Sequence, residues 1–404
     1  MSNRCMRIAA LKCFIAGGKE IDAEPRIKPL TETLRSLGVK TLYLGKDEAG
    51  SEEPYSIIVV ARGGYEKAVE LLLRPHTRGA LLVSIAGLEG LGEAVEVKDK
   101  ALRAGKKVEL IHFPDPGKES VAERLSLEVK ALRASSSALD MKILLFGVEP
   151  PPIMIEDWAR RAGLDLYLVP GREALELFRE GSEYGSLYVD TYLAAYFDLS
   201  GISEEVLSRE LGLYLAVKSV LDSEGANAVL VDCEDLSSKA GIGALMALNL
   251  LQDEGVPSAC TSFQETLLPQ MISYTLTGSP SIPVRLIDID KDKMVLKALT
   301  LPTAASARSQ IENEEGIIRI KGHPGEGSYV AIAVAKAMDR AHVLELEVLK
   351  DHEPNGPQSI TASYKGDPRG ILENLRTANM VLLKRVNKEV VAKALYYLGM
   401  DTTL

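Results

Sequence analysis

The sequence contains few of the residues that build metal cages and cross-linked scaffolds. Among its 404 residues are four cysteines, five histidines and one tryptophan, Trp158. The cysteines are widely spread and none forms a Cys-x-x-Cys pair, which argues against a disulfide framework or a zinc knuckle. The histidines show no metal-ligand spacing with one another. These absences favour a protein of the reducing cytoplasm.

Long apolar runs are also absent. No run approaches the roughly 20 residues that cross a bilayer, so we expect no membrane span. The start of the sequence is basic and is followed by a short apolar run, but Lys12 interrupts that run. A strand followed by a glycine loop explains this start better than a signal peptide does. GxSxG, HExxH and P-loop motifs are missing, so serine-hydrolase, zinc-protease and P-loop NTPase interpretations have no specific support.

The residues that are present are typical of a globular protein. Hydrophobic residues make up 46% of the chain and charged residues 26%, and both are ordinary proportions. The net charge of −10 argues against a broad nucleic-acid-binding surface. The length is sufficient for two or three domains.

The first part of the chain alternates between strand-like and helix-like segments, a pattern that indicates a doubly wound parallel sheet. The Ala134–Ala138 segment, ASSSA, is the first boundary signal. The expected strands are Arg7–Phe14, Thr41–Gly45, Ser56–Ala61, Ala80–Ile85 and Lys107–His112, and the expected helices are Glu24–Leu37, Tyr65–Leu73, Gly87–Ala104 and Glu119–Leu132.

The stretch from Gly225 to Asp290 is expected to organise the second part of the chain. It predicts strands at Ala228–Val231, Val256–Cys260 and Ile282–Ile289, separated by helices at Gly241–Leu251 and Gln264–Thr277. This order predicts right-handed crossovers in one parallel sheet. Ligands bind beyond the carboxyl ends of such strands. Those ends are Asp232–Asp235, Cys260–Ser262 and Arg285–Asp290.

The last part of the chain changes character at about residue 291, where short β-rich segments separated by turn residues indicate an antiparallel sheet or barrel. A helix at Lys388–Leu398 closes the chain. The sequence therefore predicts an α/β fold: two doubly wound parallel-sheet, Rossmann-like domains at 1–138 and 139–290, followed by a smaller β-rich domain at 291–404.

Four motifs allow a functional and a structural interpretation. The Gly87–Gly92 loop has the spacing GxxGxG rather than GxGxxG, so a tight strand-to-helix turn is favoured over a dinucleotide site. Gly63 and Gly64 allow either close approach of a ligand or a plain turn. The carboxylates of Asp232, Glu234 and Asp235 suit either a divalent ion or an acidic, helix-capping turn. His323, in a Gly-Pro-rich loop with Glu326, suits either acid–base chemistry or a simple hairpin.

Several segments together resemble the L-fucose isomerase and L-arabinose isomerase superfamily, especially its shorter fucose-isomerase-like proteins. The resemblance spans most of the chain and is strongest over Ala226–Gly278. The segments that carry it are Ile57–Glu66, Leu91–Glu96, Lys142–Gly147 with Pro150–Pro152, Asp232-Cys233, Ala244–Leu251, Asp253–Pro257, Cys260, Leu276–Gly278 and Asn379–Leu383 with the helix that follows.

The resemblance implies aldose–ketose isomerisation with a divalent metal, usually manganese, held by a Glu, an Asp and a late His. It also implies a small sugar-like ligand and a homo-oligomer, a trimer or hexamer. This sequence departs from the pattern at each position that the alignment reaches. The family's Glu falls on Thr261, its Asp on Arg285, its His-Cys-Gly segment on Lys297–Pro302 and its late His on Ala378-Asn379.

Two hypotheses follow from these departures. The first is a sugar isomerase, a ketol-isomerase that has diverged from the manganese mechanism and holds no metal. The second is a non-catalytic or metal-free paralogue that binds an anionic sugar-like ligand, through Arg285, or a partner subunit. The expected ligand-binding residues are Asp232, Thr261, Gln264, Arg285, Gly63 and Gly64, and the catalytic candidates are Glu265, Glu234 and His323.

Overall fold

The computed structural model describes residues 10–17, 25–44, 53–189, 193, 199, 202–241, 243–306, 308–314, 317–350 and 359–404. These residues form two compact units. The first unit holds the described residues up to Ser137 together with Glu389–Met400. The second unit holds Ala138–Lys388 together with Asp401–Leu404.

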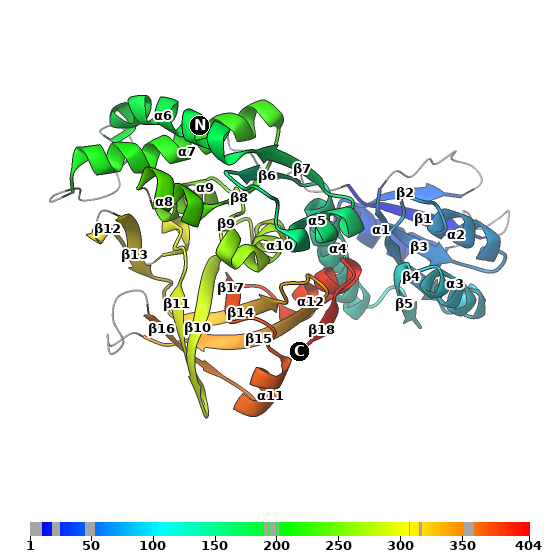
Figure 1. Ribbon diagram of the computed structural model, residues 1–404. Helices are drawn as coiled ribbons and strands as arrows, with labels where there is room; N and C mark the ends of the chain where they lie inside the picture. The colour runs from blue at the N-terminus through cyan, green and yellow to red at the C-terminus, as the bar shows by residue number, and fades with distance from the viewer. Residues whose placement is uncertain are drawn as a thin grey trace. The chain divides into compact units, whose positions relative to one another are not determined.

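The first unit is built on a five-stranded parallel sheet with strand order β2-β1-β3-β4-β5 (Figure 1). Every residue of β3 and β4 is buried, as expected for parallel strands that helices cover on both faces. The doubly wound pattern predicted for this region is therefore confirmed. The elements are β1 (Lys12–Ala16), α1 (Ile27–Ser36), β2 (Lys40–Tyr43), β3 (Tyr55–Val60), α2 (Tyr65–Leu72), β4 (Gly79–Ile85), α3 (Leu91–Arg103), β5 (Lys107–Phe113), α4 (Glu119–Leu139) and, from the end of the chain, α12 (Lys388–Tyr397).

The ASSSA segment is helical and forms the last turns of α4. Ser135, Ser136 and Ser137 are buried. The Ser135 hydroxyl donates to the carbonyl of Ala131 at 2.9 Å and to that of Ala394 at 2.8 Å. The small side chains let α4 pack closely against α12, and helix carbonyls satisfy the hydroxyl. Composition alone could not distinguish this packing from a boundary segment.

The second unit begins with a four-stranded parallel sheet of order β7-β6-β8-β9. The helix expected over Gly241–Leu251 begins later, at Leu245, because Gly241 ends a preceding helix, Cys233–Ala240, in a left-handed conformation with a φ of 62°. Ser203 is the N-cap residue of the helix Glu204–Glu224, α7. The elements are β6 (Lys142–Phe146), α5 (Ile153–Ala162), β7 (Asp165–Val169), α6 (Gly171–Tyr188), α7 (Glu204–Glu224), β8 (Ala228–Val231), α8 (Cys233–Ala240), α9 (Leu245–Asp253), β9 (Ser258–Cys260), the 3-10 helix η3 (Thr261–Thr266) and α10 (Leu267–Thr277).

An antiparallel β-barrel follows in the same unit. Its strands run in the order β14-β17-β10-β11-β16-β15, and β14 pairs with β15 to close the ring. The inner faces form one apolar core. The elements are β10 (Ile282–Asp290), β11 (Lys293–Ala298), η4 (Thr303–Ala305), the hairpin β12 (Arg308–Glu314) and β13 (Ile317–His323), β14 (Gly327–Val334), β15 (Arg340–Val348), β16 (Ser359–Tyr364), α11 (Pro368–Asn374), β17 (Asn379–Lys384) and β18 (Asp401–Thr403).

The prediction that β10 would be the third strand of the parallel sheet is wrong. β10 pairs antiparallel with β11 and β17 and belongs to the barrel. Its inward residues Ile282 and Val284 lie in the barrel core, whereas Arg285 is exposed. The alternation of inward and outward residues is typical of an antiparallel strand with one wet face. Arg285 therefore lies on the outside of a barrel rather than at the end of a parallel strand.

Polar side chains on α9 fasten the barrel to the parallel sheet of the second unit. Asn249 Oδ1 accepts from the N–H of Leu301 at 2.6 Å, and Gln252 Oε1 accepts from the Thr300 hydroxyl at 3.1 Å. Asp253 accepts from the N–H of Thr303 at 3.1 Å. Because Asn249 and Gln252 are almost fully buried, losing a partner would leave a buried polar group unsatisfied.

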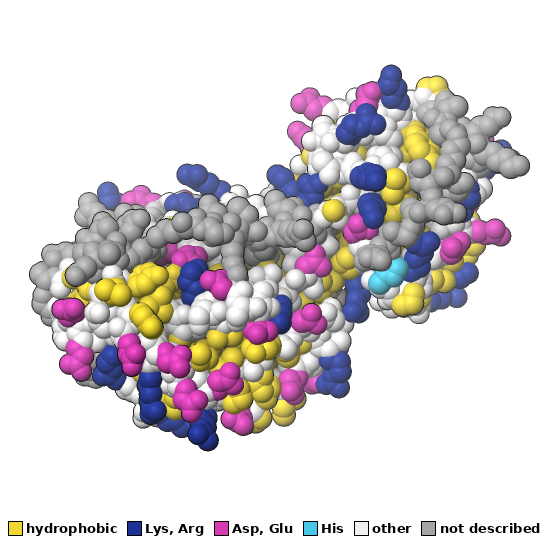
Figure 2. Space-filling model, turned by 90° about the horizontal axis from the view of Figure 1, so that it is seen from above, with side chains coloured by type: hydrophobic (Ala, Val, Ile, Leu, Met, Phe, Trp, Pro, Cys, Tyr) yellow, Lys and Arg dark blue, Asp and Glu magenta, His cyan; other side chains and the backbone are white. Residues whose placement is uncertain are grey.

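The molecular surface carries both signs of charge. On the face shown in Figure 2, acidic and basic side chains are interspersed rather than gathered in one area. Among the helices of the described residues, none combines the length and the apolar character that a membrane crossing requires.

Candidate functional site

The acidic group after β8 serves the helix that follows it. Asp232 is the N-cap of α8, and its Oδ1 accepts from the N–H of Asp235 at 3.0 Å. Asp235 in turn pairs with Lys239 at 2.9 Å, and Glu234 is exposed. This arrangement favours the helix-capping interpretation. Within the described ranges, no three His, Cys, Asp or Glu side chains are placed to hold a metal ion together.

The expectation that the cysteines stay unpaired is wrong for two of them. Cys233 and Cys260 form a disulfide, with their Cα atoms 5.5 Å apart. They are 27 residues apart in the sequence, but Cys233 comes just after β8 and Cys260 ends β9, and the carboxyl ends of these adjacent parallel strands lie side by side. Sequence spacing cannot reveal this proximity, because only the strand order creates it. The bond fixes the edge of the sheet at which ligands bind in parallel-sheet folds.

We expect reduction of the Cys233–Cys260 bond to lower the unfolding free energy of the second unit by about 3 kcal/mol, the entropy of closing a loop of this size. Denaturant titration with and without dithiothreitol, followed by Trp158 fluorescence, measures the difference. The Cys233→Ser/Cys260→Ser double variant is the control, since reductant should leave its stability unchanged. Equal responses of the wild type and this variant to reductant would refute the assignment.

Two buried acceptors lie just beyond β9, on η3. Gln264 and Glu265 are 8% and 1% exposed. Glu265 Oε1 accepts from the hydroxyl of Thr377 at 2.6 Å and from the side-chain amide of Asn379 at 2.9 Å. Gln264 Oε1 and Glu265 Oε2 have no hydrogen-bond partner in the described part of the chain. Buried oxygens without donors are uncommon and indicate a place for a ligand or water that donates hydrogen bonds.

The outer face of the barrel brings cations next to these acceptors. Arg285 on β10 pairs in register with Asn379 on β17 and with Lys297 on β11. Residues opposite each other in an antiparallel pair project from the same face. Arg285 is therefore the direct neighbour of Asn379, which binds Glu265, and Lys297 lies on the other side of Arg285. Both cations are exposed, and neither forms an ion pair with another described residue.

Together, Gln264, Glu265 and Asn379 with Arg285 and Lys297 make up what we call the η3 site. The structure brings Arg285 and Asn379 together, and Thr261 begins the same 3-10 helix as Glu265. Phe263 breaks that helix with a non-helical φ of −137°, so Glu265 is not one regular turn beyond Thr261. Lys297 and Thr377 were not among the predicted site residues. A prediction that β10 pairs with β11 and β17 would have placed Lys297 and the segment of Thr377 beside Arg285.

Gly63 and Gly64 lie in the first unit, at the carboxyl end of β3. The Glu93 carboxylate already occupies the loop, because it accepts from the N–H of Gly63 at 2.7 Å and from that of Tyr65 at 2.8 Å. A Cβ on Gly64 would lie 2.3 Å from the carbonyl oxygen of Ala16. These glycines allow tight packing and helix capping, and the structure gives no separate indication of a ligand there.

The Gly87–Gly92 loop also has a packing role. A Cβ on Gly90 would lie 2.2 Å from the carbonyl oxygen of Val60. Gly87 has a φ of 81°, and its carbonyl accepts from Arg26 at 3.0 Å. These contacts favour the tight strand-to-helix turn over a dinucleotide site.

His323 lies at the end of β13, in the turn to β14. Its Nδ1 accepts from the N–H of Gly325 at 3.2 Å, and its carbonyl accepts from the Ser306 hydroxyl at 3.2 Å. Among the described residues, no hydrogen bond links His323 to the η3 site. The hairpin interpretation accounts for these contacts.

No protein-family model and no curated protein matches this chain. The geometry of the η3 site therefore carries the functional conclusion, together with the resemblance described above.

Proposed function

We propose that the chain has the architecture of the fucose and arabinose isomerases it resembles and binds a sugar-like ligand with an anionic group at the η3 site, without a metal. The observation that carries the proposal is a set of buried acceptors close to cations that form no ion pair within the described part of the chain. Gln264 and Glu265 offer oxygens to hydroxyl donors, Asn379 binds Glu265, and Arg285 lies opposite Asn379 with Lys297 on its other side. A polyol carrying a carboxylate or phosphate has both kinds of partner.

The residues at the expected metal-ligand positions do not fit a divalent cation. Thr261, Arg285 and Asn379 stand where the resemblance requires Glu, Asp and His. A guanidinium and an ammonium on neighbouring strands repel a cation, and they attract an anion for the same reason. The single carboxylate, Glu265, already accepts two hydrogen bonds through one oxygen.

We expect Arg285→Ala to weaken binding of a sugar acid by about 10- to 100-fold, the usual cost of losing a charged hydrogen bond, and to change binding of the neutral sugar little. Calorimetric titration with fuconate and fucose measures the difference. Arg172→Ala, which removes an exposed arginine on α6, is the control. Glu265→Gln should weaken both ligands, because hydroxyl groups are common to them. Equal binding of the two ligands by wild type and Arg285→Ala would reject the proposed site.

The isomerase hypothesis is the second candidate, and Glu265 favours it. A buried carboxylate with one oxygen lacking a donor is the kind of group that moves a proton, and a guanidinium such as that of Arg285, which lies opposite Asn379, is the kind that stabilises an enediolate. Conversion of fucose to its ketose by EDTA-treated protein, lost in Glu265→Gln, would favour it over simple binding. Manganese that binds stoichiometrically and raises the melting temperature would contradict the metal-free assignment. By the same resemblance we expect a trimer or hexamer.

A further inference from the structure

The barrel interior changes from apolar to polar where β15 begins. Leu344, Leu346 and Val348 point into the barrel core. Because every second residue of a strand lies on the same face, His342 and Arg340 continue this inward face. The neighbour of β15 changes here too. β16 pairs with Leu346–Val348, whereas β18 pairs with Arg340–His342. The mouth of the barrel is therefore built from polar residues on β15 and from the last strand of the chain.

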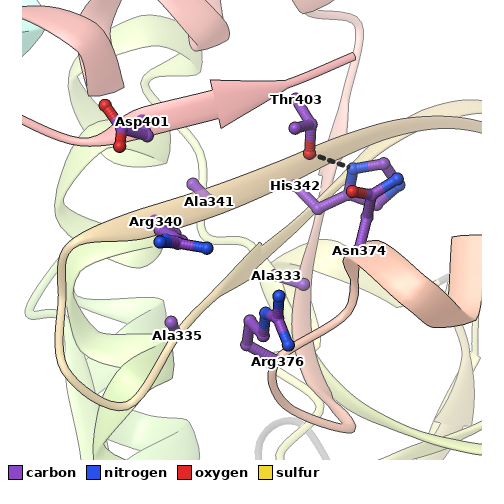
Figure 3. Close-up of a pocket in the computed structure, with 9 residues that line it drawn as sticks. All are labelled: Ala333, Ala335, Arg340, Ala341, His342, Asn374, Arg376, Asp401 and Thr403. Carbon is purple, nitrogen blue, oxygen red and sulfur yellow. Dashed lines mark hydrogen bonds between the residues drawn. The ribbon is translucent and has the colours of Figure 1, made fainter.

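A cavity of about 310 Å³ opens at this mouth. Its polar lining comes from β15, from β18 and from the segment between α11 and β17. Figure 3 shows these side chains around the hollow, with the two guanidinium groups near Ala333 and Ala335. The polar residues are Arg340, His342, Asn374, Arg376, Asp401 and Thr403. The volume is at the lower end of small-molecule sites, many of which lie in the mouths of β-barrels.

His342 is the buried polar residue of this cavity. It is only 5% exposed, and its Nδ1 lies 2.6 Å from the Thr403 hydroxyl (Figure 3). Its Nε2 is buried and has no hydrogen-bond partner among the described residues. Burial lowers the pKa of His342, which favours the neutral ring. If Thr403 donates to Nδ1, the neutral ring carries its proton on Nε2. A buried nitrogen that lacks a partner indicates a missing ligand atom or water.

The charges at the mouth favour an anion. Arg340 and Arg376 are exposed, and neither forms an ion pair with another described residue. Asp401 is the one carboxylate among the lining residues. Guanidinium groups bind carboxylate and phosphate with two parallel hydrogen bonds.

We infer that the barrel mouth binds a small metabolite through an oxyanion, a phosphate or a carboxylate, held by Arg340 and Arg376 with His342 Nε2 donating to it. This site is separate from the η3 site, because Arg340 and His342 face the inside of the barrel whereas Arg285 lies on its outside. The inference does not depend on the proposed function, and each site is tested with its own arginine.

Calorimetric titration of the full chain with glycerol 3-phosphate and with glycerate, at equal ionic strength, tests the inference. The two probes share a carbon skeleton, so the tighter one identifies the phosphate or the carboxylate. We expect Arg376→Gln to weaken that probe by at least about tenfold, since it removes charged hydrogen bonds. We expect Arg340→Gln to have a similar effect. Both residues are exposed, so the variants should fold.

Two controls separate the site from general charge effects. Arg369→Gln removes an exposed arginine on α11 that does not line the cavity, and it should bind like wild type. Arg285→Ala should also leave this binding unchanged. The inference is overturned if neither probe binds wild type at about 10 mM, a concentration that detects millimolar affinity. Equal binding by Arg376→Gln, Arg369→Gln and wild type would overturn it as well.

Discussion

Replacing Lys393 with methionine is expected to destabilise the first unit by about 3–5 kcal/mol, the usual cost of leaving a buried charge without its partner. Lys393 lies on α12 and reaches Glu128 on α4 at 2.6 Å, and it also pairs with Glu109 on β5. The Glu128 side chain is 0% exposed. Without Lys393, its remaining partner is Arg124, at 3.4 Å.

The position of Glu128 explains the size of this effect. Burial raises the pKa of Glu128, and the charges of Lys393 and Arg124 oppose that rise. Loss of Lys393 removes the larger opposing effect, so the carboxyl group must either stay charged in an apolar place or take up a proton. The destabilisation should therefore be greater at pH 8 than at pH 5.

Hydrogen exchange of the amides of β3, β4 and β5 is the suitable measurement. The one tryptophan, Trp158, lies in the second unit and does not report on the first. Lys388→Met is the control, because its ion pair with Glu345 at 3.3 Å is solvent-exposed and such pairs contribute at most about 1 kcal/mol. The double variant Glu128→Leu/Lys393→Met should recover stability. A Lys393→Met protein within about 1 kcal/mol of wild type would contradict this account.

Glu210→Gln is expected to change the pH dependence of stability in the second unit. Glu210 lies on α7 and is 1% exposed. Burial raises the pKa of Glu210 to about 8. The hydrogen bonds from the N–H groups of Gly243 and Ile318 and the charge of Arg209 lower the pKa, but by less than burial raises it. The N–H of Gly243 lies 2.7 Å from Oε1. The carboxyl group thus joins α7 to the segment before α9 and to the β12–β13 hairpin.

The direction of this effect follows from proton binding. The ordinary pKa of a glutamate carboxyl group is 4.5, so between that pH and about 8 the folded protein binds more protons at this site than the unfolded chain does. The stability from this group is complete below pH 4.5 and is lost as the pH rises through about 8. The slope reaches about 1.4 kcal/mol per pH unit, and over the whole window the loss is several kcal/mol.

The variant keeps an oxygen for Gly243 and has no proton to lose. Glu210→Gln should therefore resemble wild type near pH 5 and be more stable than wild type near pH 8. Denaturant titration followed by Trp158 fluorescence at several pH values measures the difference. Glu205→Gln, an exposed position on the same helix, should leave the pH dependence unchanged. Parallel curves for wild type and Glu210→Gln would show that Glu210 is ionised in the folded state throughout.

The sequence predicted the elements with strong periodicity. β8 has the bounds expected from its apolar run, and β3 and β4 lie within a residue of the prediction at each end. The misassigned regions have a common cause. The Cys233–Cys260 pair and β10 both depend on partners far away in the chain, which the local pattern does not contain. β10 reads as a buried strand for its first three residues and only its hairpin with β11 shows that it is antiparallel.

The candidate site was predicted in part. Gln264, Glu265 and Arg285 were expected from a resemblance, and the structure places Glu265 and the neighbours of Arg285 together through Asn379. Asp232 is instead the N-cap of α8, and Glu234 lies in the first turn of that helix. The barrel mouth was not foreseen, because Arg340, Arg376 and His342 share no local motif. Arg340 and His342 share β15, but Arg376 comes from the segment before β17, and Asp401 and Thr403 reach the mouth only because β18 pairs with the start of β15.

The division of the chain between the two units has a consequence for synthesis on the ribosome. The first unit requires α12, which is translated after the whole second sheet and the barrel. At typical elongation rates, about 10 to 50 s pass between the emergence of α4 and that of α12. During this time Glu128 lacks Lys393, and the face of α4 that α12 will cover is exposed. The amino-terminal sheet is thus made first and completed last, so nascent chains that stop before Lys393 should be sensitive to proteases in their earliest residues.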